Sequence, residues 1–158
     1  MGWNTLFHTK KSDVAHFEKT IGYKFSNKQL LMTALTHKTY AFEAPTPLEF
    51  NERLEFLGDS ILNFVIAEEL YRGNKFFSEG ELTRRRSLEV NNNMLADVAK
   101  QLDLGRYLLL GKGATKQEGE KNRTNLANAL EAVIGAMYLD SDLNTVRTFI
   151  INKVIANK

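Results

Sequence analysis

The stretch NERLEFLGDS, residues 51–60, carries three carboxylates, Glu52, Glu55 and Asp59, interleaved with apolar residues. At about 100° per residue on an α-helix, the three acids fall within about 60° of arc. An amphipathic helix buries its apolar face and leaves the opposite face to water or to a ligand. The apolar face expected here consists of Leu54, Leu57, Ile61 and Val65. The stretch therefore predicts a helix whose acidic stripe points away from its own core.

Two interpretations of this acidic stripe are open from spacing alone. A solvated acidic face is the usual meaning of such spacing, although like charges three or four residues apart repel by about 0.2–0.5 kcal/mol. Arg53 lies off the stripe and does not offset that repulsion. Clustered carboxylates without a matching cation are, by contrast, typical of a divalent-metal site. Phe56 lies beside the acids, where an aromatic ring is either covered by another helix or exposed for a partner.

Length and composition narrow the classes of protein. The chain has 158 residues, which suits one domain, and its formal charge of +2 is not the excess of a protein that binds nucleic acid by bulk charge. It has no cysteine, so a bound metal is expected to be a hard cation such as Mg²⁺. No apolar run reaches the roughly 20 residues of a membrane span, and the N-terminus lacks a signal-peptide core. We therefore expect a cytoplasmic protein without membrane contact.

Apolar residues recur mostly at helical spacing, and no segment alternates with a period of two, so the predicted class is all-α. Residues 41–50 contain both prolines and predict a loop, and residues 104–124 are glycine-rich and predict mostly loop. The predicted helices are one that begins after Ser12 or Asp13, one that ends near His37, and four more at about 48–71, 80–102, 124–139 and 143–156.

A second acidic helix is predicted at LANALEAVIGAMYLD, residues 126–140. Asn128 and Glu131 share one face at a spacing of three residues, and Gly135 allows another helix to approach closely. A core helix with a polar edge is one interpretation. The other is that Asn128 and Glu131 complete a metal site with the acids of the first helix.

These segments resemble the endonuclease domain of the ribonuclease III family. NERLEFLGDS is similar to the signature stretch of that family nearly residue for residue. Further similarity lies in LTHKTY (35–40), EGELTRRRSLEVNNNMLA (79–96) and LGKGATKQEGEKNRTNLANALEAVIGAMYLD (110–140). The resemblance covers about residues 16–155, so we expect a single domain over 1–158, without the double-stranded RNA-binding domain of the common bacterial form.

The resemblance implies an all-helical homodimer that hydrolyses double-stranded RNA, leaving 5′-phosphate and 3′-hydroxyl ends, as in rRNA and mRNA processing. It implies Mg²⁺, with Mn²⁺ as a substitute, held at Glu55, Asp59, Asn128 and Glu131. Glu52 and Glu79 match further acidic positions near the dimer valley, and Phe56 matches an aromatic residue that contacts the partner subunit. Expected contacts to the RNA backbone are Arg84, Lys112, Lys116, Lys121 and Arg123, with a solvated basic surface as the alternative.

Three positions depart from the family pattern. The family has aspartate where this chain has Asn128, and the lost charge implies weaker Mg²⁺ binding and slower cleavage. The alternative is a catalytically inert RNA-binding or structural subunit. Arg85 and Glu89 stand where the family usually has leucines, and their spacing predicts either an exposed ion pair or an altered partner surface.

Overall fold

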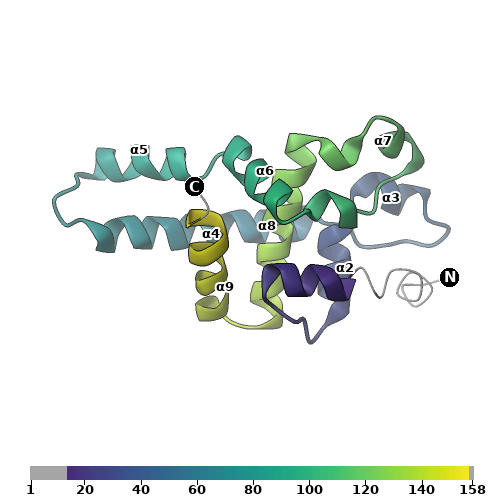
Figure 1. The fold of residues 1–158 in the computed structure, drawn as a ribbon, viewed down its shortest axis with the longest axis horizontal. Coiled ribbons are helices and arrows are strands. Elements are labelled where there is room, and N and C mark those ends of the chain that lie inside the picture. The colour runs from purple at the N-terminus through teal and green to yellow at the C-terminus, as the bar shows by residue number, and fades with distance from the viewer. Residues whose placement is uncertain (1–13, 157–158) are drawn as a thin grey trace.

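The computed structural model describes residues 14–156, and this part of the chain is helical, as predicted (Figure 1). Its only strand-like pairing is an isolated bridge between Thr36 and Leu109. After a first helix at residues 14–21, the α-helices are α2 (Lys28–Leu35), α3 (Lys38–Glu43), α4 (Glu52–Gly73), α5 (Glu79–Glu89), α6 (Asn92–Gln101), α7 (Lys112–Lys116), α8 (Arg123–Asp140) and α9 (Leu143–Phe149). Shorter elements are the 3₁₀ turns η1 (Leu104–Tyr107) and η2 (Gly119–Lys121), and the π-helical segment η3 (Ile150–Ile155).

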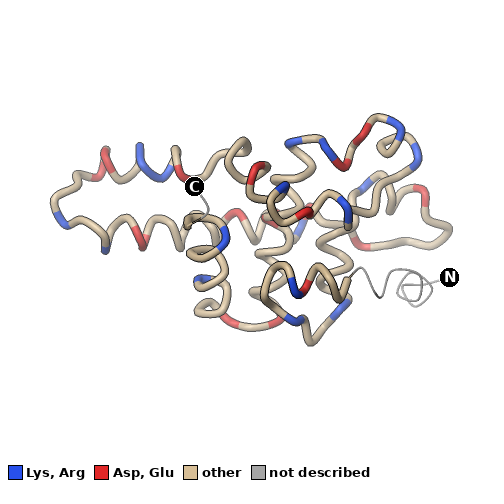
Figure 2. Tube along the Cα trace, in the orientation of Figure 1, with Lys and Arg blue, Asp and Glu red and all other residues tan. Residues whose placement is uncertain are grey.

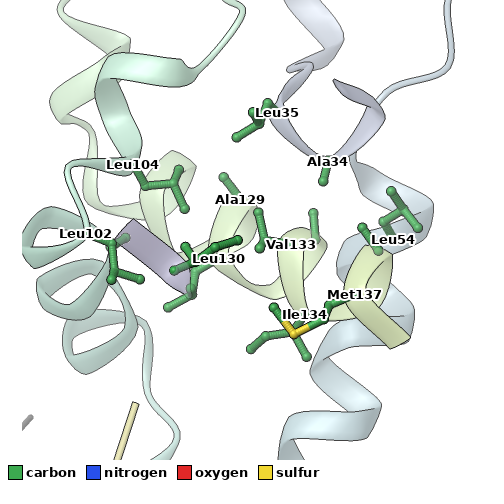
Figure 3. Close-up of a cluster of buried hydrophobic side chains, with 14 of the residues drawn as sticks. Ala34, Leu35, Leu54, Leu102, Leu104, Ala129, Leu130, Val133, Ile134 and Met137 are labelled. Atoms are coloured by element: carbon green, nitrogen blue, oxygen red, sulfur yellow. The ribbon is translucent and has the colours of Figure 1, made fainter. Parts of the chain in front are cut away.

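Helix α8 forms the centre of the core. Its middle turns are buried on every side, which is the pattern of a helix surrounded by others. Figure 3 shows Leu130 and Ile134 of α8 lying between the side chains of Leu102 and Leu104 and those of Ala34, Leu35 and Leu54. Glu131 belongs to this same buried stretch, so the fold places a carboxylate inside an apolar centre.

Two glycines mark the place where α4 crosses α8. A Cβ atom on Gly58 would lie 1.8 Å from the carbonyl oxygen of Glu131, and a Cβ atom on Gly135 would lie 2.3 Å from the carbonyl oxygen of Leu54. Any side chain at either position would overlap the main chain of the other helix. The two backbones therefore touch, and the close approach expected at Gly135 is confirmed.

The second half of α4 and the whole of α5 extend from this body as an antiparallel pair, which we call the arm (Figure 1). None of the residues of α5 is buried. The guanidinium of Arg147 on α9 is bonded to the carboxylates of Glu68 and Glu69, with 2.8 Å between Nη1 and Glu69 Oε1. The arm is therefore attached to the body by α4 itself and by polar contacts at its base.

Several predicted helix bounds are wrong, because local capping was overlooked. The helix expected at 80–102 is two helices, since the Asn91 side chain accepts the Met94 N–H at 3.0 Å and starts α6. The helix expected to end near His37 ends at Leu35, and His37 caps α3 instead by accepting the Thr39 N–H at 3.3 Å.

The remaining bounds differ less. Helix α4 begins at Glu52 rather than near 48, and residues 47–50 before it have no regular secondary structure. The loop expected at 41–50 loses its first residues to α3, and the last predicted helix changes to π-type bonding after Phe149. Ser12 and Asp13, the expected first caps, lie outside the described residues. No helix among residues 14–156 is long and apolar enough to cross a membrane.

Candidate metal site at the helix crossing

The crossing of α4 and α8 brings together the four residues predicted to hold a metal. Glu55 and Asp59 flank Gly58 on α4, and Asn128 and Glu131 lie on the facing turn of α8. The acids lie close enough to repel one another, because the charges of Asp59 and Glu55 both raise the pKa of Glu131. Contact between the two backbones therefore gathers oxygen donors from separate helices into one site.

Glu131 is the most perturbed group of the site. Its side chain is only 8% exposed. Burial raises its pKa from 4.5 to about 7, and repulsion from Asp59 and Glu55 contributes to the same shift. A buried carboxylate held near other carboxylates is a group that a divalent cation would stabilise in its charged form.

Glu55 is half-buried beside Glu131. Burial raises its pKa above the ordinary value, and the nearby Glu52 adds to that shift. A hydrogen bond from the side chain of Asn128 and the positive charge of Lys38 act in the opposite direction. As a neutral hydrogen-bond donor, Asn128 therefore stabilises the charged form of Glu55, as a bound cation would also do.

Asp59 forms the exposed side of the site. Its carboxylate accepts a hydrogen bond from Asn63 Nδ2 at 2.7 Å, which orients the group along the surface of α4. Across residues 14–156, no three histidine, aspartate or glutamate side chains already converge on one point as a metal cage. The oxygen donors are nevertheless of the type that Mg²⁺ prefers. The donor chemistry fits such an ion, and binding it requires rotation of these side chains.

The two further acidic positions lie differently. Glu52, on the first turn of α4, is exposed and forms an ion pair with Lys38, with 3.0 Å between Nζ and Oε1. Glu79 starts α5 at the tip of the arm and accepts a hydrogen bond from Thr83 Oγ1 at 2.8 Å. Glu55 and Asp59 lie well before the end of α4 at Gly73, so the helix separates them from that tip by roughly 20–27 Å at 1.5 Å per residue. Within one subunit Glu79 is not part of the site.

The basic residues expected to contact RNA fall into two groups. Arg84 and Lys121 are paired with nearby glutamates, and Arg123 is paired with Asp97 at 2.8 Å. Lys112 and Lys116 are exposed at the two ends of α7. Figure 2 shows acidic and basic residues interspersed along residues 112–123 rather than a uniformly basic surface.

Arg85 and Phe56 are the other two singled-out positions. Arg85 Nε donates to Glu81 Oε1 at 2.7 Å, and its guanidinium lies 4.1 Å from the ring centroid of Phe77. Arg85 thus forms an ion pair with Glu81 toward the start of α5, with the acid first, which is the more favourable order. The side chain of Phe56 is 78% exposed. It lines an open apolar groove with Leu30, Leu48, Phe50, Leu54, Leu57 and Leu139.

Two residues that matter here were not singled out from the sequence. Gly58 sets the helix crossing, and its signal is a glycine within an apolar helix, directly between two of the predicted ligands. Lys38 lies in the LTHKTY segment, where nothing in the spacing connects it with an acid of another helix.

The fold and site define a class: the all-helical nuclease domain of ribonuclease III. The nuclease domain of ribonuclease III from Campylobacter jejuni superposes with a TM-score of 0.84 at 34% identity, over 90% of this chain and 96% of that one. That structure is described as showing structural flexibility in the region involved in dimer formation. A family model, Ribonuclease-III-like, matches residues 27–158. The chain belongs to the ribonuclease III family.

The chain matches only part of the length of its curated relatives. Ribonuclease 3 of Borreliella burgdorferi is 41% identical over 146 residues, which are 92% of this chain and 60% of the relative. Ribonuclease 3 of Vibrio cholerae is 48% identical over 131 residues, which are 83% of this chain and 56% of the relative. The chain thus spans less than two thirds of the length of these relatives.

Proposed function

We propose that this chain is a single catalytic domain of a Mg²⁺-dependent endoribonuclease that cleaves double-stranded RNA. The observation that carries the proposal is the backbone contact at Gly58 and Gly135, which gathers Glu55, Asp59 and Glu131. A fold needs no buried carboxylate beside two others, since each uncompensated charge opposes folding. A site that binds a divalent cation and a phosphate gives these charges a use.

In this proposal Glu55, Asp59 and Glu131 would hold the ion, and Asn128 would offer its amide oxygen. When bound, Mg²⁺ or Mn²⁺ polarises the scissile phosphate and lowers the pKa of the attacking water. Buried Glu131 would release its proton to water as the ion binds, and exposed Asp59 would lie on the substrate side of the site. Hydrolysis breaks the bond between phosphorus and the 3′ oxygen, so the products carry 5′-phosphate and 3′-hydroxyl ends.

The proposed working unit is a symmetric homodimer. An isologous interface uses the same surface on both subunits, and exposed Phe56 beside an apolar groove is a surface that can complement itself. Each subunit would then supply one site, so that one dimer cuts both strands. Such an enzyme belongs to rRNA and mRNA processing in the cytoplasm, and it reads RNA through backbone and 2′-hydroxyl contacts.

Asn128 supports a second candidate, a catalytically inert subunit that binds RNA or serves a structural role. A neutral amide replaces the aspartate of the family, and its hydrogen bond stabilises Glu55 without any metal. In an active enzyme the same substitution weakens Mg²⁺ binding and slows cleavage. The two candidates therefore differ in whether any metal concentration supports cutting.

A cleavage assay on long double-stranded RNA separates these candidates. Cutting in Mg²⁺ or Mn²⁺, but not in Ca²⁺, is the result expected for the enzyme. Asn128→Asp should raise the rate and lower the Mg²⁺ concentration needed for half-maximal cleavage. Binding of RNA without cutting, for the unchanged chain and for Asn128→Asp at every metal concentration, would instead identify the inert subunit.

A further inference from the structure

Lys38 is a half-exposed cation at the edge of the acidic site, where it pairs with Glu52 rather than with a proposed metal ligand. We infer that its ammonium group binds a phosphate of double-stranded RNA next to the scissile bond, and that Glu52 holds it there until RNA arrives. This inference rests on the proposed function, to which it adds a positioning residue. The argument depends on how Lys38 is anchored, where its charge lies, and how weakly its present partner holds it.

The backbone around Lys38 is fixed on both sides. Thr36 O accepts the N–H of Asn51 at 2.9 Å, which connects this corner to the start of α4. The N–H of His37 donates to Leu109 O at 3.0 Å, and Thr39 Oγ1 accepts the N–H of Gly111 at 3.0 Å. Lys38 therefore projects from a rigid corner, at a constant position relative to the acids of α4.

The charge of Lys38 reaches the proposed metal ligands. Its Nζ lies 3.0 Å from Glu52 Oε1, one helical turn before Glu55. Its positive charge also opposes the rise in the pKa of Glu55, which is an effect of proximity. A phosphodiester that enters this site brings one more negative charge to a group of carboxylates. A cation at the edge reduces that repulsion at the point where it is largest.

The present ion pair of Lys38 is easily exchanged. The side chains of Lys38 and Glu52 are 50% and 49% exposed, so water screens their pair and the pair is weak. An ammonium group is a compact point charge that suits a phosphate oxygen without demanding one orientation. Replacing Glu52 with a phosphate therefore costs little, and it leaves the Glu52 carboxylate free beside Glu55.

Binding in Ca²⁺ across a series of KCl concentrations tests the phosphate contact without requiring cleavage. We expect Lys38→Met to weaken binding about three- to tenfold at low salt and to reduce the slope of log K against log [KCl] by about one. Lys38→Arg should restore the slope, because it retains the charge. Glu52→Gln should leave the slope unchanged, because it removes only the standby partner. Lys24→Met, at an exposed lysine outside the site, is the matched control.

Two outcomes would overturn the inference. A Lys38→Met slope equal to that of Lys24→Met would exclude a phosphate contact. An identical loss in Lys38→Met and Glu52→Gln would show that the ion pair acts only through the fold. Failure of the unchanged chain to bind RNA at all removes both this inference and the proposed function. Binding without cutting would exclude only the catalytic proposal, and the salt dependence of binding by Lys38→Met would still test this inference.

Cleavage gives an independent readout in the Asn128→Asp background. There, Lys38→Met should lower kcat/KM about tenfold, mainly through KM, and the loss should shrink as KCl is raised. A salt-independent loss confined to kcat would contradict a phosphate contact. Equal melting temperatures for the variants would exclude unfolding as the cause.

Discussion

One helix, α4, lies in two very different environments. Its first half meets α8 backbone to backbone at Gly58, beside buried Leu54, Ile61 and Leu62. Its second half still buries Val65 and Ile66, but it ends in the arm, where α5 buries no residue and Tyr71 is 73% exposed. Dense packing fixes α4 up to Ile66, whereas its last turns are held by surface contacts. The comparison teaches that the proposed metal site is built on the stable end of α4, and that the arm opens at lower cost.

Glycine substitutions should show the largest difference in stability between the helix crossing and the arm. Gly58→Ala should destabilise the chain by about 3 kcal/mol or more, because its Cβ would overlap the Glu131 carbonyl at 1.8 Å. Gly80→Ala on the arm meets nothing within 4 Å and should instead stabilise α5 by about 0.5–1 kcal/mol. Urea unfolding measures both changes. Similar midpoints for the two variants would contradict the close backbone contact.

The pH dependence of stability tests the buried carboxylate. The pKa of Glu131 is about 7 in the folded chain and near 4.5 when unfolded. Between these values the folded state retains a proton that the unfolded state has lost, so stability falls as pH rises through this window. We expect a loss on the order of 2 kcal/mol in EDTA, after allowance for solvent screening.

Thermal melts at pH 5 and pH 8 check this prediction. Glu131→Gln should flatten the difference, and Mg²⁺ should reduce it in the unchanged chain by favouring the ionised carboxylate. If the melting temperatures of Glu131→Gln still differed between pH 5 and pH 8, the pH dependence would come from another group.

Substitution of Arg147 tests how the base of the arm is attached to the body. Arg147→Met removes the contacts to Glu68 and Glu69, and we expect a loss of about 1 kcal/mol with faster hydrogen exchange in α5 and the second half of α4. Arg72→Met serves as the control, because Arg72 also bonds Glu68 but lies exposed on the arm. Equal exchange rates in the two variants would show that Arg147 does not attach the arm to the body.

The smallest effect is expected on α5 itself. Arg85→Leu exchanges a half-buried pair with Glu81 and a stacked contact with Phe77 for an apolar side chain. Because both contacts are partly open to water, the loss should be about 0.5 kcal/mol. Chemical denaturation detects a change of this size only against the Arg84→Leu control. A loss above 2 kcal/mol would mean that the arm is more tightly packed than its exposure indicates.

The sequence predicted the stable end of α4 better than the arm. Long amphipathic stretches around Glu55 and Glu131 made both helices and their acids visible, because apolar periodicity reports directly on burial. The break at Asn91 was hidden in a run of three asparagines within a region of helical spacing. The ion pair of Lys38 with Glu52 depends on how two helices meet, and no local pattern carries that information.

Contact between the main chains of α4 and α8 has a consequence for redesign. Their separation is fixed by peptide groups, so exchanging a side chain at the proposed site leaves the spacing of the two helices unaltered. Position 128 can therefore be exchanged between asparagine and aspartate as a change in charge at nearly constant shape. The effect of charge on the ion affinity of the proposed site can therefore be measured while the spacing of the two helices stays constant.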